Sequence, residues 1–167
     1  LIGVEREHLK EAPHLAVHCD VERGELLGRA LVDALLASPH YGEHQARYWL
    51  DAVRYGDTHG LHLDNRRGIF PYRDWVVRAF NRNQPLDEFL TWQLAGDLLP
   101  ETAGESSVAR HARIIATGFL TLGPKMLAED DPLKQQMDII DDQIETLGRA
   151  FLGLSIGCAR CHDHKFD

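Results

Sequence analysis

The chain has 167 residues, of which 44% are hydrophobic and 26% charged, and this composition is ordinary for a globular domain with a buried core. Its formal net charge of -8 argues against nucleic acid and anionic membrane surfaces as partners, because phosphates require a basic face. No apolar run approaches the roughly 18 residues of a membrane-spanning helix, so the sequence predicts no membrane span.

Apolar residues spaced by three and four predict helices along most of the chain. They follow an irregular lead-in over residues 1–20, which shows no clear periodicity. Proline, glycine and serine mark the helix ends, and residues 117–125 are expected to form a loop. The predicted helices cover residues 21–37, 43–55, 72–80, 85–99 and 107–115.

The clearest predicted element is a last helix, which Asp131 and Pro132 open. Its apolar residues recur at alternating steps of four and three, which predicts a seam packed against a core. The seam consists of Leu133, Met137, Ile140, Ile144, Leu147, Phe151 and Leu154. The outer, solvated face is predicted to carry Lys134, Asp138, Asp141, Asp142, Glu145 and Arg149. Gly157 is placed to end this helix in the left-handed conformation. Since no alternating strand pattern appears, the predicted fold class is all-α, an irregular bundle of five to seven helices with long polar loops.

Near its end the chain carries Cys158-Ala159-Arg160-Cys161-His162, the Cys-x-x-Cys-His order of a c-type haem attachment site. Two thiols three positions apart can add to the two vinyl groups of one porphyrin. The adjacent imidazole of His162 can then take an axial position on the iron as the proximal ligand. The motif therefore predicts covalent haem c and a role in electron transfer.

Other chemistries fit the same two cysteines. They can form a redox dithiol, a disulfide, or half of a zinc site that His162 or His164 completes. A thioredoxin-like dithiol needs a βαβ setting that the sequence lacks, and Cys19 is a weak second element for zinc. The alternative is thus a module with zinc or another divalent cation, or a substrate-recognition module with Cys158 and Cys161 in a disulfide. Whether the chain is part of an enzyme such as an oxidoreductase stays open.

A polar, glycine-flanked loop over residues 56–71 offers further ligands. Asp57, His59, His62 and Asp64 can chelate a divalent cation, whereas the ordinary interpretation is a solvated loop with Asx turns. If this loop approaches the cysteines, one of its imidazoles can be the distal ligand of the haem iron. The candidates for that position are His59, His62, Met126, Met137 and His164.

Several segments resemble the planctomycete-type secreted cytochrome-like domain, domain of unknown function 1549. The similarity runs from about Gly24 to the end and rests on Leu36–Glu43, Tyr48–Asp51, Tyr55–Asp57, Pro71–Val76, Ala79–Asn81, Gln93–Pro100, Ala116–Phe119 and Gly157–Asp167. The resemblance implies Cys158, Cys161 and His162 as haem-binding residues and supplies no catalytic ones. It also implies an exported protein, periplasmic or secreted, with an additional cytochrome c domain upstream and an uncharacterised domain downstream.

Residues 21–167 are therefore expected to form a single helical, cytochrome-like domain. The sequence begins without an initiator methionine or a signal peptide, so we expect it to be a piece of a longer chain. The expected partner is a redox protein or the neighbouring cytochrome c domain of the same chain.

Overall fold

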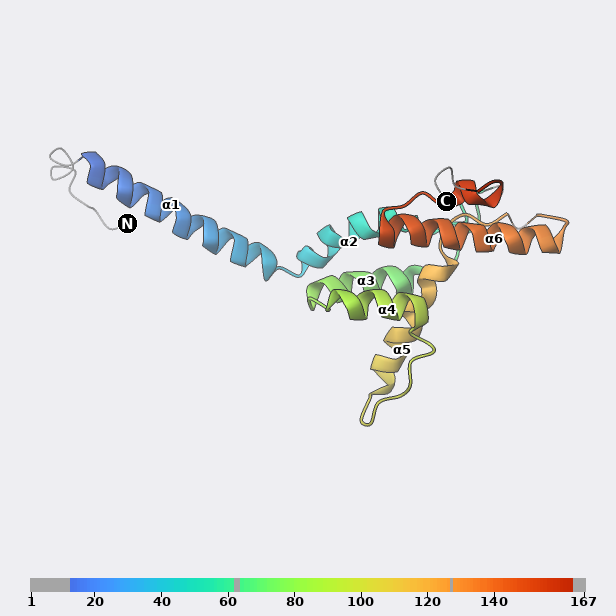
Figure 1. The fold of residues 1–167 in the computed structure, drawn as a ribbon. Coiled ribbons are helices and arrows are strands. Elements are labelled where there is room, and N and C mark those ends of the chain that lie inside the picture. Colours follow the sequence, from blue (N-terminus) through green and yellow to red (C-terminus); the bar gives the residue numbers. More distant parts are fainter. Residues whose placement is uncertain (1–12, 62–63, 127, 164–167) are drawn as a thin grey trace. The chain divides into compact units, whose positions relative to one another are not determined.

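The computed structural model describes residues 13–61, 64–126 and 128–163, with side chains from residue 23 onward. Within these ranges the fold is an irregular all-α bundle, as predicted (Figure 1). The β-structure in these ranges is limited to an isolated bridge between Thr58 and Arg66. The helices are α1 (Pro13–Leu36), α2 (His40–Ala52), α3 (Phe70–Asn81), α4 (Leu86–Ala95), α5 (Ser107–Ala116) and α6 (Pro132–Leu147).

Residues 1–41 and 42–167 form two compact units. The first contains α1, which begins at Pro13, a residue type that suits the first helical turn because its missing N–H needs no partner there. Residues 13–20 are thus helical, and the predicted irregular lead-in is wrong for them; residues 1–12 lie outside the described part. The second unit, from Gly42 onward, contains most of α2 together with α3, α4, α5 and α6. No helix within the described ranges is long and apolar enough to cross a membrane.

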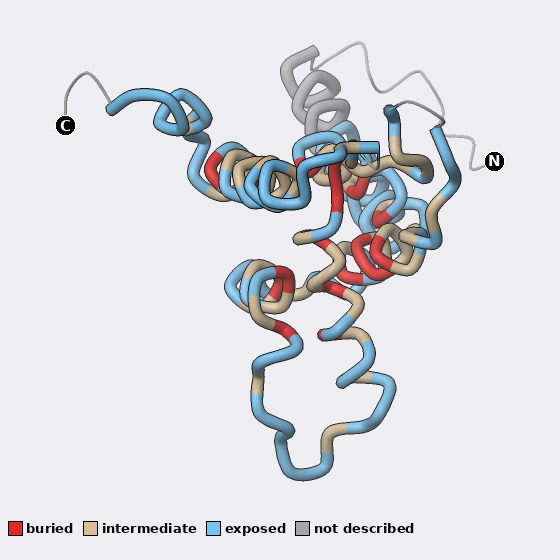
Figure 2. The backbone as a smooth tube through the Cα atoms, turned by 90° about the vertical axis from the view of Figure 1, so that its right-hand side faces the viewer, coloured by how far each residue is buried: buried red, intermediate tan, exposed pale blue. Residues whose placement is uncertain are grey.

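The core of the second unit is built around α3, which buries Tyr72, Trp75, Val76 and Ala79. The ring of Trp75 stacks on that of Phe89 from α4, with 5.1 Å between ring centroids. Further apolar contacts come from the segment that contains α5 and the 3-10 turn Thr117–Thr121, a turn that replaces part of the loop predicted over 117–125. The buried positions gather where these helices meet (Figure 2).

A buried polar network joins α2, α3 and α4. The indole nitrogen of Trp49 donates to the Tyr72 hydroxyl and to Oε1 of Gln93, both at 3.0 Å. The Tyr72 hydroxyl donates to the same Gln93 oxygen at 2.6 Å, and burial raises the pKa of Tyr72 far above its usual value. The Gln93 amide donates back to the Phe89 carbonyl at 3.0 Å. Each polar group of this fully buried glutamine therefore has a partner, as burial requires.

α4 ends at Ala95, before the predicted end at residue 99, because the chain there turns against α5. A Cβ atom on Gly96 would lie 2.3 Å from the carbonyl oxygen of Arg113, so only glycine permits this approach. The buried Arg113 guanidinium donates to the carbonyls of Gly96 and Leu99 at 2.9 and 3.0 Å. It also forms an ion pair with Glu105 at 2.7 Å, and these contacts hold the connection between α4 and α5.

α6 begins as predicted, with the Asp131 carboxylate accepting from the amides of Leu133 and Lys134. It packs on the domain through its polar face, however. Asp142 pairs with Arg54, and the Gln143 side chain donates to the Leu120 carbonyl at 2.7 Å. The prediction that Asp142 lies on a solvated outer face is therefore wrong.

The predicted burial of the seam is also wrong for its residues from Leu133 to Ile144, whereas Phe151, beyond the end of α6, packs on the core as predicted. Leu133 is 64% exposed, and Met137, Ile140 and Ile144 are 44%, 36% and 51% exposed. The physical reason is the surface that α6 meets, which offers the Arg54 guanidinium and loop carbonyls. Such groups require polar partners, and only the polar face of α6 supplies them.

The predicted continuous helix to Leu154 ends at Leu147 and continues as a π-helical turn over Gly148–Leu152. The left-handed residue that follows is Gly153, with φ of 67°, and not Gly157 as predicted. The chain then reverses, and residues 156–160 run back along α6 (Figure 1). Gly148 leaves room for this return, since a Cβ atom there would lie 3.0 Å from the Ile156 side chain.

Candidate functional site

The Cys-x-x-Cys-His motif begins on a 3-10 turn over Gly157–Arg160, with Cys161 as the C-cap and His162 directly after it. The amide of Cys161 donates to the Cys158 carbonyl at 3.1 Å, which closes the turn. Residues three apart eclipse one another in a 3-10 helix, so Cys158 and Cys161 lie on the same side of this turn. Both thiols are free and exposed, and His162, which follows them, is exposed as well.

Three carboxylates of α6 hold the motif turn in place. Glu145 accepts from the amides of Ile156 and Gly157 at 2.9 and 2.5 Å. Arg160, the second variable residue of the motif, forms ion pairs with Asp138 and Asp141, both at 2.6 Å. The turn is therefore attached to a long helix by contacts at both of its ends.

These contacts make the attachment of the motif depend on pH. Hydrogen bonds from Arg160 and Lys134 hold the pKa of Asp138 below its ordinary value of 3.8. Burial alone would raise the pKa of Glu145, but hydrogen bonds from Gly157, Arg149 and Ile156 outweigh it and leave this pKa below 4.5. Because both pKa values are lowered in the folded state, the contacts are fully formed above the ordinary values and are lost as the pH falls through the lowered ones.

We expect the amide resonance of Gly157 to stay constant from neutral pH down to about 4.5 and to move on further acidification. Nuclear magnetic resonance on the ¹⁵N-labelled chain measures this directly. The amide of Gly96, which donates to the Trp92 carbonyl, is the internal reference. Glu145→Gln should abolish the Gly157 titration step. A Gly157 resonance that titrates unchanged in this variant would contradict the assignment.

The polar loop over 56–71 does not assemble the predicted metal ligands within its described residues. The Asp57 carboxylate accepts from the Tyr55 hydroxyl at 2.6 Å, and burial together with this hydrogen bond raises the pKa of Tyr55 to about 12. Asp64 accepts from the Gly60 amide at 2.9 Å, and hydrogen bonds from Thr58 and Gly60 lower its pKa. These are the contacts of a turn-rich loop, and no group of three possible metal ligands occurs in the described part of the chain.

The candidates for the distal position of a haem iron fall into three groups. His62 and His164 lie outside the described residues. His59 is half-buried, and its Nδ1 has no hydrogen-bond partner in the described structure. Met126 and Met137 are both largely exposed, the first in a loop and the second on α6.

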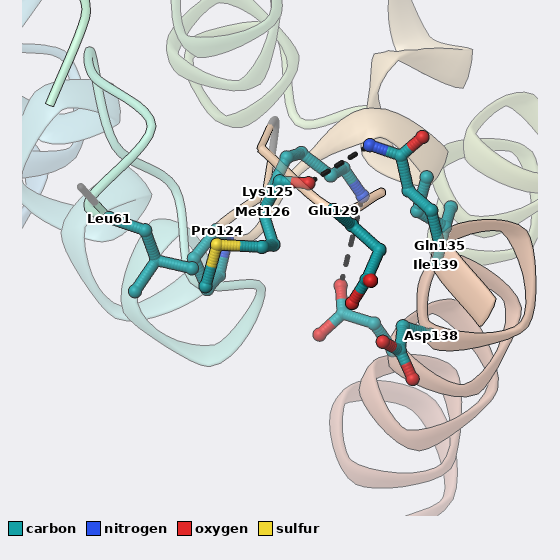
Figure 3. Close-up of a pocket in the computed structure, with 9 residues that line it drawn as sticks. Leu61, Pro124, Lys125, Met126, Glu129, Gln135, Asp138 and Ile139 are labelled. Atoms are coloured by element: carbon teal, nitrogen blue, oxygen red, sulfur yellow. Dashed lines mark hydrogen bonds and ion pairs between the residues drawn. The ribbon is translucent and has the colours of Figure 1, made fainter. Parts of the chain in front are cut away.

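A cavity of about 430 Å³ lies between α6 and the loop segments that contain Leu61 and Met126 (Figure 3). Leu61, Pro124 and Met126 form its apolar side, and the Gln135 amide of α6 fixes the Met126 carbonyl at 2.9 Å. Asp138, which binds Arg160 of the motif, also lines it.

Lys125 gives this cavity a charged interior. Its side chain is 15% exposed, and its ammonium group lies 3.9 Å from the Asp142 carboxylate. Burial lowers the pKa of Lys125, and Arg67 and Arg54 act in the same direction against Asp142. Glu129, Asp138 and Asp142 line the cavity as well, so charged groups share a lining that is mostly apolar.

The residues present fit a covalently bound haem c. Attachment needs two reduced thiols on one side of a short, held segment and an adjacent imidazole, and Cys158, Cys161 and His162 meet these requirements. The sequence predicted these three residues but not what holds them. Arg160 within the motif and the acidic residues of the last helix are both visible in the sequence. The sequence does not show that the chain folds back along this helix and brings them together.

Neither the curated proteins nor the solved structures contain a significant match to this chain. A family model does match, over residues 20–167, and it is described as PSCyt2, protein of unknown function (DUF1549). The match covers nearly the whole chain, including the motif turn and the helix that holds it. The chain therefore belongs to the PSCyt2 (DUF1549) family.

Proposed function

We propose that this chain carries one covalent haem c and serves electron transfer in an exported multidomain redox protein. Cys158 and Cys161 form the thioether bonds, and His162 is the proximal iron ligand. The observation that carries the proposal is the pair of free, exposed thiols on one side of a turn that Arg160 and Glu145 fix to α6. When bound, the haem supplies reversible one-electron chemistry of iron.

The attachment reaction uses only groups that the motif presents. Each thiol adds across the carbon–carbon double bond of one vinyl group, so that sulfur bonds to one carbon and the thiol hydrogen ends on the other. The step needs no net oxidant or reductant but requires both thiols in the reduced state, and neither thiol is engaged in a disulfide here. The contacts of Glu145 keep the turn in one conformation and so lower the entropic cost of two bonds to one macrocycle.

The partner is proposed to be another redox centre, either a neighbouring cytochrome c domain of the same chain or a separate protein. A net charge of -8 favours a partner with a basic or neutral docking surface. Export to the periplasm or beyond is part of the proposal, since attachment of haem c depends on export and dedicated ligation machinery.

The test is to express the chain with an export signal in a bacterial host that matures c-type cytochromes, beside an identical culture without the attachment machinery. We expect the intact mass to increase by one haem, and an absorption band of haem iron that changes on reduction, only in the first culture. An unmodified mass, with no haem retained after acid-acetone extraction, would contradict the proposal. Stoichiometric zinc in that unmodified protein would instead support the non-haem alternative.

A further inference from the structure

The apolar seam of α6 is exposed on the side of the helix that the domain does not cover. Thr146 and Gln143 face the domain, with Thr146 only 3% exposed and the Gln143 amide bound to the Leu120 carbonyl. Met137, Ile140 and Ile144 face away from it. A row of three large apolar side chains along one helix face is costly to leave in water.

The motif turn is fixed directly beside this seam. Each carboxylate that holds the turn follows a seam residue in the sequence: Asp138 follows Met137, Asp141 follows Ile140, and Glu145 follows Ile144. One residue turns an α-helix by about 100°, so the carboxylates form a stripe next to the seam at the same heights along the axis. Cys158 and Cys161, exposed on this turn, are therefore held at the edge of the seam.

We propose that Met137, Ile140 and Ile144 form the wall that covers one face of the haem attached at Cys158 and Cys161; this inference rests on the proposed function. The seam from Met137 to Ile144 extends about 10 Å along the helix, a length comparable with the width of a porphyrin macrocycle. The apolar faces of the macrocycle match these side chains.

The cavity around Met126 is the competing location, and its chemistry fits the macrocycle less well. Its lining carries Lys125, Glu129 and Asp142 in addition to Asp138. An apolar ring placed there would take the partly exposed carboxylates of Glu129 and Asp142 out of water, which costs free energy. On the seam the ring would lie on apolar side chains, with the neighbouring carboxylates at its edge.

The two methionines of the chain distinguish the two locations, because one lies on the seam and the other in the cavity. Met137 is 44% exposed and Met126 is 47% exposed, so a methionine-selective oxidant such as chloramine-T should modify both at similar rates in haem-free protein. In the haem-loaded chain we expect oxidation of Met137 to fall about fivefold or more, with Met126 unchanged. Peptide mass spectrometry measures both sulfoxides in one sample.

The paired substitution Ile140→Ser and Ile144→Ser should restore Met137 oxidation toward the haem-free rate while covalent haem content stays the same. Leu98→Ser is the matched control, because Leu98 is 78% exposed outside the seam, and it should leave Met137 protected. Protection of Met126 instead of Met137, or of neither in haem-loaded protein, would overturn the seam as the wall. A chain that acquires no haem overturns the proposed function itself, and the intact mass separates that result from the others.

Discussion

The double variant Cys158→Ala, Cys161→Ala is expected to retain no covalent haem while keeping the fold of the haem-free protein. Both side chains are exposed and free, so their removal should change the free energy of unfolding by no more than about 0.5 kcal/mol. The haem that remains after denaturation is measured by intact mass and by haem staining of denaturing gels. Circular dichroism and the thermal midpoint of haem-free wild type and variant provide the comparison for folding.

Single variants sharpen this test. Cys158→Ala and Cys161→Ala each leave one thiol on the same turn, so haem bound through one thioether is expected at reduced yield. If the cysteines hold zinc, the double variant should lose the metal and a measurable part of its thermal stability. Wild-type levels of covalent haem in the double variant would contradict attachment at these residues.

The fold could be predicted from local patterns wherever those patterns decide the structure. The start of α6 at Asp131 and Pro132 depends on a few neighbouring residues, and this prediction is confirmed. Which face of a helix is buried depends on the surface against which the helix packs. For α6 the spacing of the apolar residues therefore predicted the wrong buried face. The decisive partner, Arg54, is far from Asp142 in the sequence.

For the candidate site, too, the sequence predicts the local motif but not the distant contacts that hold it. The motif residues could be named because their chemistry requires a fixed spacing, whereas their support comes from a reversal of the chain at Gly153. In the sequence, Gly157 was the apparent helix end, and Glu145 was one acidic residue among several on an outer face. Only the folded-back chain brings the Glu145 carboxylate to the Gly157 amide.

The largest effect on stability is expected in the buried network of Trp49, Tyr72 and Gln93. Tyr72→Phe and Gln93→Leu each remove one of the two acceptors of the Trp49 indole N–H and should each cost about 1–2 kcal/mol. In either single variant the other acceptor remains at 3.0 Å. Gln93→Leu alone also leaves the Tyr72 hydroxyl without its acceptor, and both single variants lose the direct Tyr72–Gln93 hydrogen bond. The double variant loses that bond only once and no longer contains the unpaired hydroxyl, although it leaves the Trp49 donor without a partner. It should therefore cost no more than the sum of the single changes.

Denaturant unfolding of the four proteins in this cycle, followed by tryptophan fluorescence, measures the coupling. Tyr48→Phe is the matched control, because Tyr48 is 63% exposed and its substitution should leave the free energy of unfolding unchanged. A cost clearly above the sum would contradict the network, because it would mean that the Tyr72 hydroxyl finds another acceptor when Gln93 is replaced. A cost at or below the sum would show that the Tyr72–Gln93 hydrogen bond itself contributes to stability, and hence that α2, α3 and α4 are joined through one coupled network.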